Sequence, residues 1–175
     1  MKITAVDNLN DLFLVEDFYP QEIIEKVNQT DFLAYKYEPV LVQGQFTRRN
    51  LKSDRFLNKL DTWSNEALSE LIKQTDLNLT LLGCGFWLDT ENYYMDQHID
   101  AINHVSAGMQ IYIKDSDKSL GTCFYNPDGS VRYQFEYKVN TGYLMINNEH
   151  QVHAMTTAVP HNQYRLSVYH WLKLR

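Results

Sequence analysis

From residue 77 onward, short apolar runs alternate with polar and turn-forming residues. This pattern predicts β-strands rather than helices, because strands are short and are bounded by turn signals. The proline and glycine of Asn126-Pro127-Asp128-Gly129 stand where a tight hairpin turn uses them. The predicted strands cover residues 77–88, 96–100, 106–113, 121–125, 133–138, 143–146, 153–158 and 165–172.

Residues 1–76 show a mixed pattern. A short apolar run at 12–15 predicts a strand, and Pro20 suits the first turn of a helix whose apolar positions fall at 23–27. The tyrosine-rich stretch 33–46 has a strand-like composition. This part of the chain therefore combines both kinds of element.

A second helix is predicted after residue 52. Ser53 suits its N-cap, and apolar residues recur at helical spacing from Phe56 to Ile72. The pattern leaves open whether this is one long helix or two short ones broken at 62–64.

Helices followed by eight short strands predict an all-β core with helices, arranged as a double-stranded β-helix, or jelly roll. We expect the helices to pack on one sheet and the two sheets to enclose a ligand cavity. The length of 175 residues fits a single domain. Within it, residues 1–76 would form a mixed support region and residues 77–175 the jelly-roll core.

Three residues of the strand-rich part have the chemistry of an iron site. His98 and Asp100 stand two positions apart on a predicted strand, so both side chains point to the same side. His153 begins a distant predicted strand and can reach the same ion if that strand folds back alongside. Two histidines and one carboxylate occupy one face of Fe(II) and leave positions open for water, cosubstrate and dioxygen.

Other histidines compete for the distal ligand position. His150 stands in the polar stretch 147–149, which predicts a turn, and His161 follows Pro160 in a predicted loop. We favour His153, because it begins an apolar run. His170 alternates with aromatic residues on the last strand and is predicted to be a packed strand residue.

Arg165 and Ser167 share the same two-residue spacing on the last predicted strand. Together they offer a guanidinium fork and a hydroxyl to a carboxylate. A buried arginine in an apolar strand needs an anion, and 2-oxoglutarate chelating the iron would supply one through its far carboxylate. A surface arginine in an ordinary ion pair is the alternative interpretation.

The ordered set His-x-Asp, a distant His and Arg-x-Ser resembles the motif of Fe(II)/2-oxoglutarate-dependent dioxygenases. The resemblance is closer to the prolyl-4-hydroxylase-like branch, in which segments similar to residues 109–114, 120–125 and 140–147 occur in this order. The opening segment 13–20, followed by an apolar-patterned helix, is also similar to the start of such domains. The resemblance therefore spans most of the chain.

This resemblance implies Fe(II) as the metal, 2-oxoglutarate as cosubstrate and ascorbate as a reductant. It also places Tyr112 where the family has a tyrosine bonded to the cosubstrate carboxylate, although a plain core aromatic remains an equal reading. Asp100 favours hydroxylation, because the resembling halogenases lack this carboxylate. Trp87, Tyr93 and Tyr94 precede His98 and either line the substrate pocket or pack in the core.

Composition narrows the class of partner. Apolar residues make up 44% of the chain and charged ones 22%, as in ordinary globular proteins. The net charge of −6 disfavours a nucleic-acid groove, and with it the repair of alkylated bases. No run suits a membrane span or a secretory signal, and two strand-borne cysteines fit a reducing, cytoplasmic compartment.

We expect a peptide or a small molecule as substrate, with a peptidyl residue such as proline favoured by the resemblance. A free amino acid is the alternative, and a non-enzymatic barrel of cupin type is the alternative from another class. Loops at residues 43–52 and 89–94 are predicted to form the walls of a peptide groove. The basic cluster Arg48, Arg49, Lys52 and Arg55 within the first is predicted to be a solvated loop face.

Overall fold

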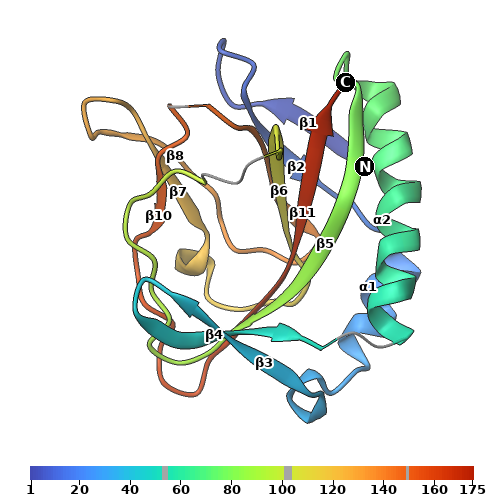
Figure 1. The fold of residues 1–175 in the computed structure, drawn as a ribbon, viewed down its shortest axis with the longest axis vertical. Helices are drawn as coiled ribbons and strands as arrows, with labels where there is room; N and C mark the ends of the chain where they lie inside the picture. Colours follow the sequence, from blue (N-terminus) through green and yellow to red (C-terminus); the bar gives the residue numbers. More distant parts are fainter. Residues whose placement is uncertain (53–54, 101–103, 149) are drawn as a thin grey trace.

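The computed structural model describes residues 1–52, 55–100, 104–148 and 150–175, and describes no side chains at 55–57. Two antiparallel sheets face each other, with helices α1 and α2 outside the larger one (Figure 1). The larger sheet has the order β1-β2-β9-β6-β11-β5-β4-β3, and the smaller has the order β10-β7-β8. The predicted double-stranded β-helix with helices on one sheet is confirmed.

The helices and strands have the following bounds in chain order. The helices are α1 (Gln21–Asn28) and α2 (Arg55–Gln74), with single 3-10 turns η1 (Phe32–Ala34) and η2 (Lys118–Leu120). The strands are β1 (Lys2–Ala5), β2 (Leu12–Glu16), β3 (Tyr37–Val42), β4 (Gln45–Leu51), β5 (Leu79–Asp89), β6 (Ala107–Tyr112), β7 (Thr122–Tyr125), β8 (Val131–Gln134), β9 (Thr141–Ile146), β10 (His153–Met155) and β11 (Arg165–Leu174).

The predicted strand at 96–100 is wrong as a regular strand. Only His98 pairs there, in an isolated antiparallel bridge with His153 at the edge of the smaller sheet. The backbone N–H and C=O groups of these two residues bond to each other at 3.0 and 2.9 Å. A single bridge is enough to hold His98 beside β10, so the segment needs no continuous ladder.

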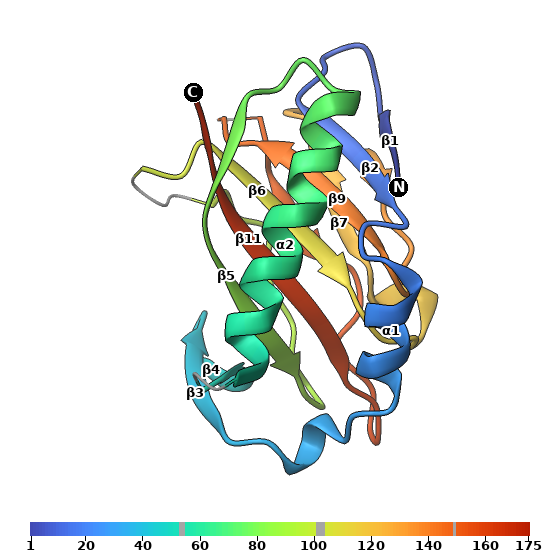
Figure 2. The same cartoon turned by 90° about the vertical axis from the view of Figure 1, so that its right-hand side faces the viewer.

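The helices pack their apolar faces against the larger sheet (Figure 2). Helix α1 buries Ile23, Ile24 and Val27, and Pro20 is its N-cap. Helix α2 is one helix of 20 residues, which decides between the two alternatives left by the sequence. The N-cap predicted at Ser53 lies outside the described residues.

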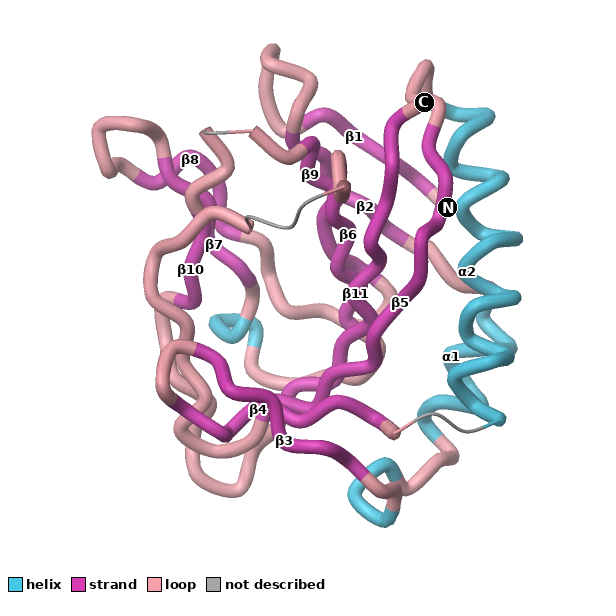
Figure 3. Tube along the Cα trace, in the orientation of Figure 1, coloured by secondary structure: helices cyan, strands magenta, loops and turns pink. Residues whose placement is uncertain are grey.

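The strands before residue 76 extend the larger sheet on both sides (Figure 3). On one side β2 pairs with β9, and on the other β4 pairs with β5. Strands β3 and β4 form a hairpin whose turn has positive φ at Gln43 and Gly44, the conformation of a type I′ turn. The division of the chain at residue 76 into support and core stays a prediction.

Strand β11 separates two interiors, because its side chains alternate between the faces of the sheet. Leu166, Val168 and Leu172 face the helices within one apolar cluster. Tyr169 and Trp171 belong to a second cluster between the two sheets. The residues that share the latter face therefore point into the interior of the barrel.

The sequence also led to predictions about the cysteines and about membrane crossing. Both cysteines are free; Cys123 is buried, and the thiol of Cys84 donates to Asp61 Oδ1 at 3.0 Å. Among the described residues, no helix combines the length and apolar character that a membrane crossing requires. The cytoplasmic location stays a prediction.

Candidate metal and cosubstrate site

The structure brings His98, Asp100 and His153 together. One ligand atom from each lies within 4.8 Å of the others. Nε2 of His98 is 3.4 Å from Asp100 Oδ1, and Nε2 of His153 is 3.8 Å from the same oxygen. Two imidazole nitrogens and one carboxylate oxygen thus converge on one point, although the segment that carries His98 is not a regular strand.

Both histidines are fixed in the tautomer that a metal ligand needs. Nδ1 of His98 lies 2.8 Å from the carbonyl oxygen of Asp96, and Nδ1 of His153 lies 2.9 Å from that of Gln151. A carbonyl oxygen only accepts, so each Nδ1 must donate its hydrogen. In the neutral imidazole each Nε2 then presents a lone pair toward the cluster, an arrangement typical of metal-binding histidines.

Asp100 is oriented by a tyrosine from β11. The hydroxyl of Tyr169 donates to Asp100 Oδ2 at 2.6 Å, which leaves Oδ1 facing the two histidines. The ring of Tyr169 stacks on Trp87 at a centroid distance of 4.9 Å. Gly108 lies beneath the hydroxyl, and a Cβ there would collide with it. Glycine at this position lets the tyrosine reach across the sheet to the carboxylate.

Electrostatics favour an ionised carboxylate in this cluster. Burial alone would raise the pKa of Asp100, but contacts with His98, His153 and Tyr169 lower it to about 2. Burial lowers the pKa of His153, whereas for His98 the contacts with Asp100 and Asp96 outweigh burial and raise the pKa. A neutral His153 and an ionised Asp100 are the forms that bind a cation.

The cluster opens into a narrow cavity of about 50 Å³ between the two sheets. This volume is small for a ligand pocket. The cavity is lined by the three candidate ligands, two arginines, and further aromatic, polar, methionine and alanine side chains. The lining residues are Arg48, Trp87, Tyr93, Met95, His98, Asp100, Gln110, Thr122, Tyr143, His153, Ala154, Met155, Arg165 and Tyr169.

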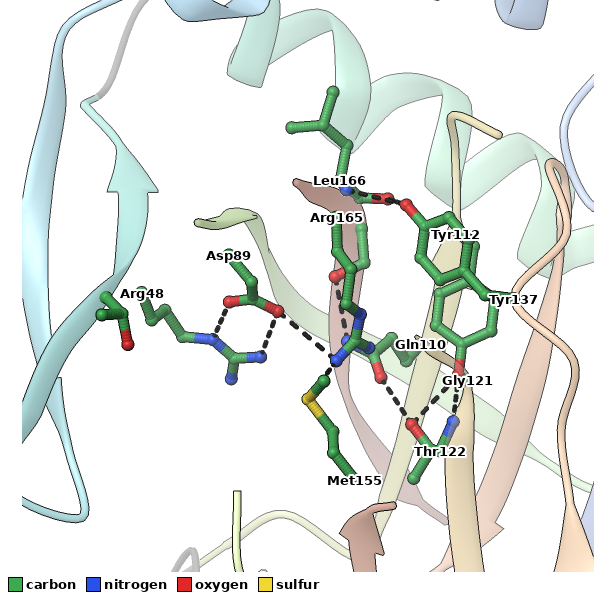
Figure 4. A network of polar contacts seen from close by, with 12 residues as sticks. Arg48, Asp89, Gln110, Tyr112, Gly121, Thr122, Tyr137, Met155, Arg165 and Leu166 are labelled. Atoms are coloured by element: carbon green, nitrogen blue, oxygen red, sulfur yellow. Dashed lines mark hydrogen bonds and ion pairs between the residues drawn. The ribbon is translucent and has the colours of Figure 1, made fainter. Parts of the chain in front are cut away.

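Arg165 is buried in this cavity, as the sequence predicted (Figure 4). Its Nη1 donates to the sulfur of Met155 and lies 3.7 Å from Asp89 Oδ2, too far for a hydrogen bond. Its Nε is buried and has no hydrogen-bond partner among the described residues. An unpaired buried donor is costly, and it points to an acceptor that the protein itself does not supply.

Ser167 and Tyr112 are not among the residues that line the cavity, and the hydroxyls of both are engaged by other residues. The hydroxyl of Ser167 accepts from Gln110 Nε2 at 2.9 Å. The hydroxyl of Tyr112 donates to Thr122 Oγ1 and accepts from the Thr122 N–H, while its ring centroid lies 5.7 Å from Arg165. Tyr112 is thus both a core aromatic and a neighbour of the arginine.

Sequence reasoning missed a second buried arginine. Arg48 is only 5% exposed and makes two bonds, of 2.6 and 2.9 Å, to Asp89, which is fully buried (Figure 4). The solvated loop face predicted here is wrong for Arg48, although Arg49 and Lys52 are exposed. The side chain of Arg55 lies outside the described residues.

The predicted groove loop at 43–52 is wrong in form, because residues 45–51 are strand β4, paired with β5. At 89–94, Asp89 ends β5 and residues 90–94 lie outside helices and strands, but Tyr93 is fully buried. A role of either segment in a peptide groove stays a prediction. The sequence signal that could have revealed the buried pair of Arg48 and Asp89 is Asp89 itself. This carboxylate directly ends an apolar strand and needs a cation if it is buried.

The competing histidines lie elsewhere. His150 is exposed, and His161 pairs with Glu91 at 2.8 Å at the surface. Neither belongs to the cluster of potential metal ligands found among the described residues. His153 is the histidine that lies beside His98 and Asp100.

The residues present fit a divalent metal and an anion. The donor set of two imidazoles and one carboxylate, with both tautomers fixed, suits a non-haem Fe(II) ion. The unpaired Nε of Arg165 suits an anion at the other end of the cavity. The fit for a metal rests on three converging ligand atoms, and the fit for an anion rests on one unsatisfied donor.

No family model and no curated protein matches this sequence. Solved structures do match its fold, each at low identity. A 2OG-Fe(II) oxygenase family oxidoreductase from Burkholderia pseudomallei is 12% identical, with a TM-score of 0.68, over 93% of this chain and 85% of that one. A Pseudomonas putida prolyl-4-hydroxylase is 14% identical, with a TM-score of 0.65, over 97% of both chains.

A third match is HygX from Streptomyces hygroscopicus, solved with nickel, 2-oxoglutarate and hygromycin B. It is 9% identical, with a TM-score of 0.66, over 93% of this chain and 82% of that one. The resemblance inferred from the sequence is thereby confirmed at the level of the fold. These likenesses cover 93–97% of this chain.

Proposed function

We propose that this protein is an Fe(II)- and 2-oxoglutarate-dependent dioxygenase that hydroxylates an unactivated C–H bond, with a peptidyl residue such as proline as its target. The observation that carries the proposal is the convergence of His98, Asp100 and His153 on one point inside the barrel. An oxygenase fold without this ligand set would not support it.

The chain's own contribution at the metal is orientation. His98 and His153 would bind Fe(II) through Nε2, because their Nδ1 atoms donate to backbone carbonyls. Asp100 would bind through Oδ1, since Tyr169 holds the other oxygen. When bound, iron and 2-oxoglutarate supply the oxidising chemistry that inserts one atom of dioxygen into a C–H bond and yields succinate and CO2.

Arg165 would hold the far carboxylate of 2-oxoglutarate through its unpaired Nε, with Ser167 donating a second hydrogen bond. For Tyr112 to join them, its hydroxyl must give up its bond to Thr122. The aromatic and thioether side chains around this end of the cavity, among them Met155, exclude water and so strengthen the ion pair.

A peptide substrate is supported by exposed apolar side chains close in sequence to residues that line the cavity. Phe46, two positions before Arg48 on β4, is 62% exposed. Gln43, at the tip of the same hairpin, accepts a bond from the backbone N–H of Asp96 at 2.7 Å, so the hairpin lies beside the metal segment. Ile99, between two candidate ligands, is 42% exposed. Exposed apolar side chains at these positions suit a polymer that inserts one side chain into the cavity.

The first test is anaerobic addition of Fe(II) and then 2-oxoglutarate to the purified protein. We expect the weak visible charge-transfer band of the iron–2-oxoglutarate chelate. Its absence, despite bound iron, would leave a non-enzymatic, cupin-like barrel as the better interpretation.

The second test concerns the substrate. Proline-containing peptides should stimulate conversion of 2-oxoglutarate to succinate above the uncoupled background and should gain one oxygen atom by mass spectrometry. Free proline should do so weakly. Efficient hydroxylation of free amino acids, with peptides ignored, would replace the peptidyl substrate by a small molecule and leave the iron site standing.

A further inference from the structure

Three charged residues form a row across neighbouring strands of the larger sheet. Asp89 on β5 is in register with Arg48 on β4 and with Arg165 on β11. All three side chains are buried and point into the same interior, where the two arginines flank the carboxylate (Figure 4). One aspartate therefore lies between two cations, and the two cations do not share it equally.

The carboxylate of Asp89 is hydrogen-bonded to Arg48 and not to Arg165. Both of its oxygens accept bonds from Arg48, at 2.6 and 2.9 Å, whereas Arg165 Nη1 stays 3.7 Å from Oδ2. The guanidinium of Arg48 lies 4.0 Å from the ring centroid of Trp87 and 4.5 Å from that of Tyr93, so aromatic contacts hold it in place. Such a bidentate pair is geometrically specific.

The consequence for Arg165 follows from charge. With both oxygens of Asp89 hydrogen-bonded by Arg48, the guanidinium of Arg165, which makes no hydrogen bond to Asp89, keeps more of its attraction for an outside anion. A divalent metal, Asp100 and Arg165 then carry two net positive charges, which match the two carboxylates of 2-oxoglutarate. Without Arg48, Asp89 would turn to Arg165 from the next strand and compete with that anion at close range.

We infer that Arg48 is a positioning residue for cosubstrate binding: by occupying Asp89, it keeps Arg165 free to bind the distal carboxylate of 2-oxoglutarate. The inference rests on the proposed function. It adds a role for β4, which supplies none of the proposed metal ligands, and it makes Asp89 an internal competitor of the cosubstrate.

The test is the dissociation constant of 2-oxoglutarate from Mn(II)-loaded protein, measured anaerobically by calorimetry. Arg48→Gln should raise it about tenfold, an effect typical of residues that share one network. Asp89→Asn should not raise it, because the competitor is removed. The double variant Arg48→Gln/Asp89→Asn should return to within about threefold of the wild-type value. Arg49→Gln, on the exposed face of β4, is the matched control and should change nothing.

The rescue by Asp89→Asn separates this role from a merely structural one, since a loss of packing at Arg48 would persist in the double variant. If Arg48→Gln does not fold, Arg48→Lys serves instead: it keeps the charge but not the fork, and should raise the constant about threefold. In turnover, the KM for 2-oxoglutarate should rise while kcat is kept.

An unchanged constant in the folded Arg48 variants, or an equal weakening with and without Asp89→Asn, overturns the inference. Failure of the wild-type protein to bind 2-oxoglutarate at all overturns the proposed function instead. Wild-type binding that depends on Arg165 but not on Arg48 overturns only the role of Arg48.

Discussion

Two buried histidines, His153 and His170, show how the two interiors of this protein differ. Both are almost inaccessible, and burial lowers the pKa of each. His170, between the sheet and the helices, uses both ring nitrogens: Nδ1 faces the Met109 carbonyl, and Nε2 lies 3.0 Å from the Tyr19 hydroxyl and 3.1 Å from that of Ser64. His153 uses only Nδ1 in this way.

The same contrast extends beyond the histidines. Around His170, the neighbouring Tyr19 and Ser64 hydroxyls bond to each other at 2.9 Å, so the polar groups of that cluster satisfy one another. In the cavity, Arg165 Nε and the Tyr93 hydroxyl have no hydrogen-bond partner among the described residues. In a polar cluster that stabilises a fold, the donors and acceptors satisfy one another. In one that binds a ligand, some donors and acceptors have no partner within the protein.

The largest expected effect comes from removing a candidate ligand. His98→Ala, Asp100→Ala or His153→Ala should weaken Fe(II) binding more than about 100-fold and abolish turnover, because loss of a ligand exceeds the effect of losing an outer partner. Titration with Fe(II) under anaerobic conditions measures this. His150→Ala and His161→Ala are the controls and should leave metal binding nearly intact; loss of metal in His150→Ala but not in His153→Ala would refute our distal ligand.

The next largest effect is expected at Arg165, whose Nε has no hydrogen-bond partner among the described residues. Arg165→Ala should leave iron bound but weaken 2-oxoglutarate by about 2–5 kcal/mol, the cost of breaking a desolvated charge pair. Ser167→Ala should cost less, about 0.5–1.5 kcal/mol, because one hydrogen bond is lost. Calorimetry on the metal-loaded variants decides the matter. An affinity unchanged by Arg165→Ala would remove the oxygenase assignment.

On the helix side, the expected effect is on stability and not on ligands. The pKa of His170 falls from 6.5 to about 4 on folding, so between these values the unfolded chain binds more protons. Stability is therefore lost as the pH falls through this window, by about 2 kcal/mol between pH 7 and pH 5. Urea unfolding at both pH values should show a loss that is larger in the wild type than in His170→Gln by about this amount. Equal pH dependence in both proteins would mean that His170 titrates normally.

The smallest effect concerns the bond between the Tyr169 hydroxyl and Asp100 inside the cavity. Tyr169→Phe removes the bond to Asp100 Oδ2 while it keeps the stack on Trp87. Metal affinity should fall about tenfold, the lower end of what outer-shell partners contribute. Tyr164→Phe, on the neighbouring segment but outside the cavity, should have no effect. A tenfold loss in both variants would show that the hydroxyl of Tyr169 does not act through Asp100.

Much of this site was readable because its spacing is local. Arg165 and Ser167 are separated by two positions on β11, and the period of a strand puts both on one face. His98 and Asp100 have the same spacing and converge with His153, although residues 96–100 do not form a regular strand. The row of Arg48, Asp89 and Arg165 could not be predicted from the sequence. It depends on which strands are neighbours and in which register they pair, and a shift of one residue would turn each side chain to the opposite face.

The sequence by itself determined the class of fold, the alternation of faces and the chemical character of the candidate ligands, because periodicity and side-chain chemistry are local properties. Only the tertiary structure decided that Arg48 is buried, that Asp89 is its partner, that Tyr169 holds Asp100, and that residues 96–100 need a single bridge and not a strand. These contacts join segments far apart in the chain, and their geometry is set by the packing of two sheets, which no local pattern encodes.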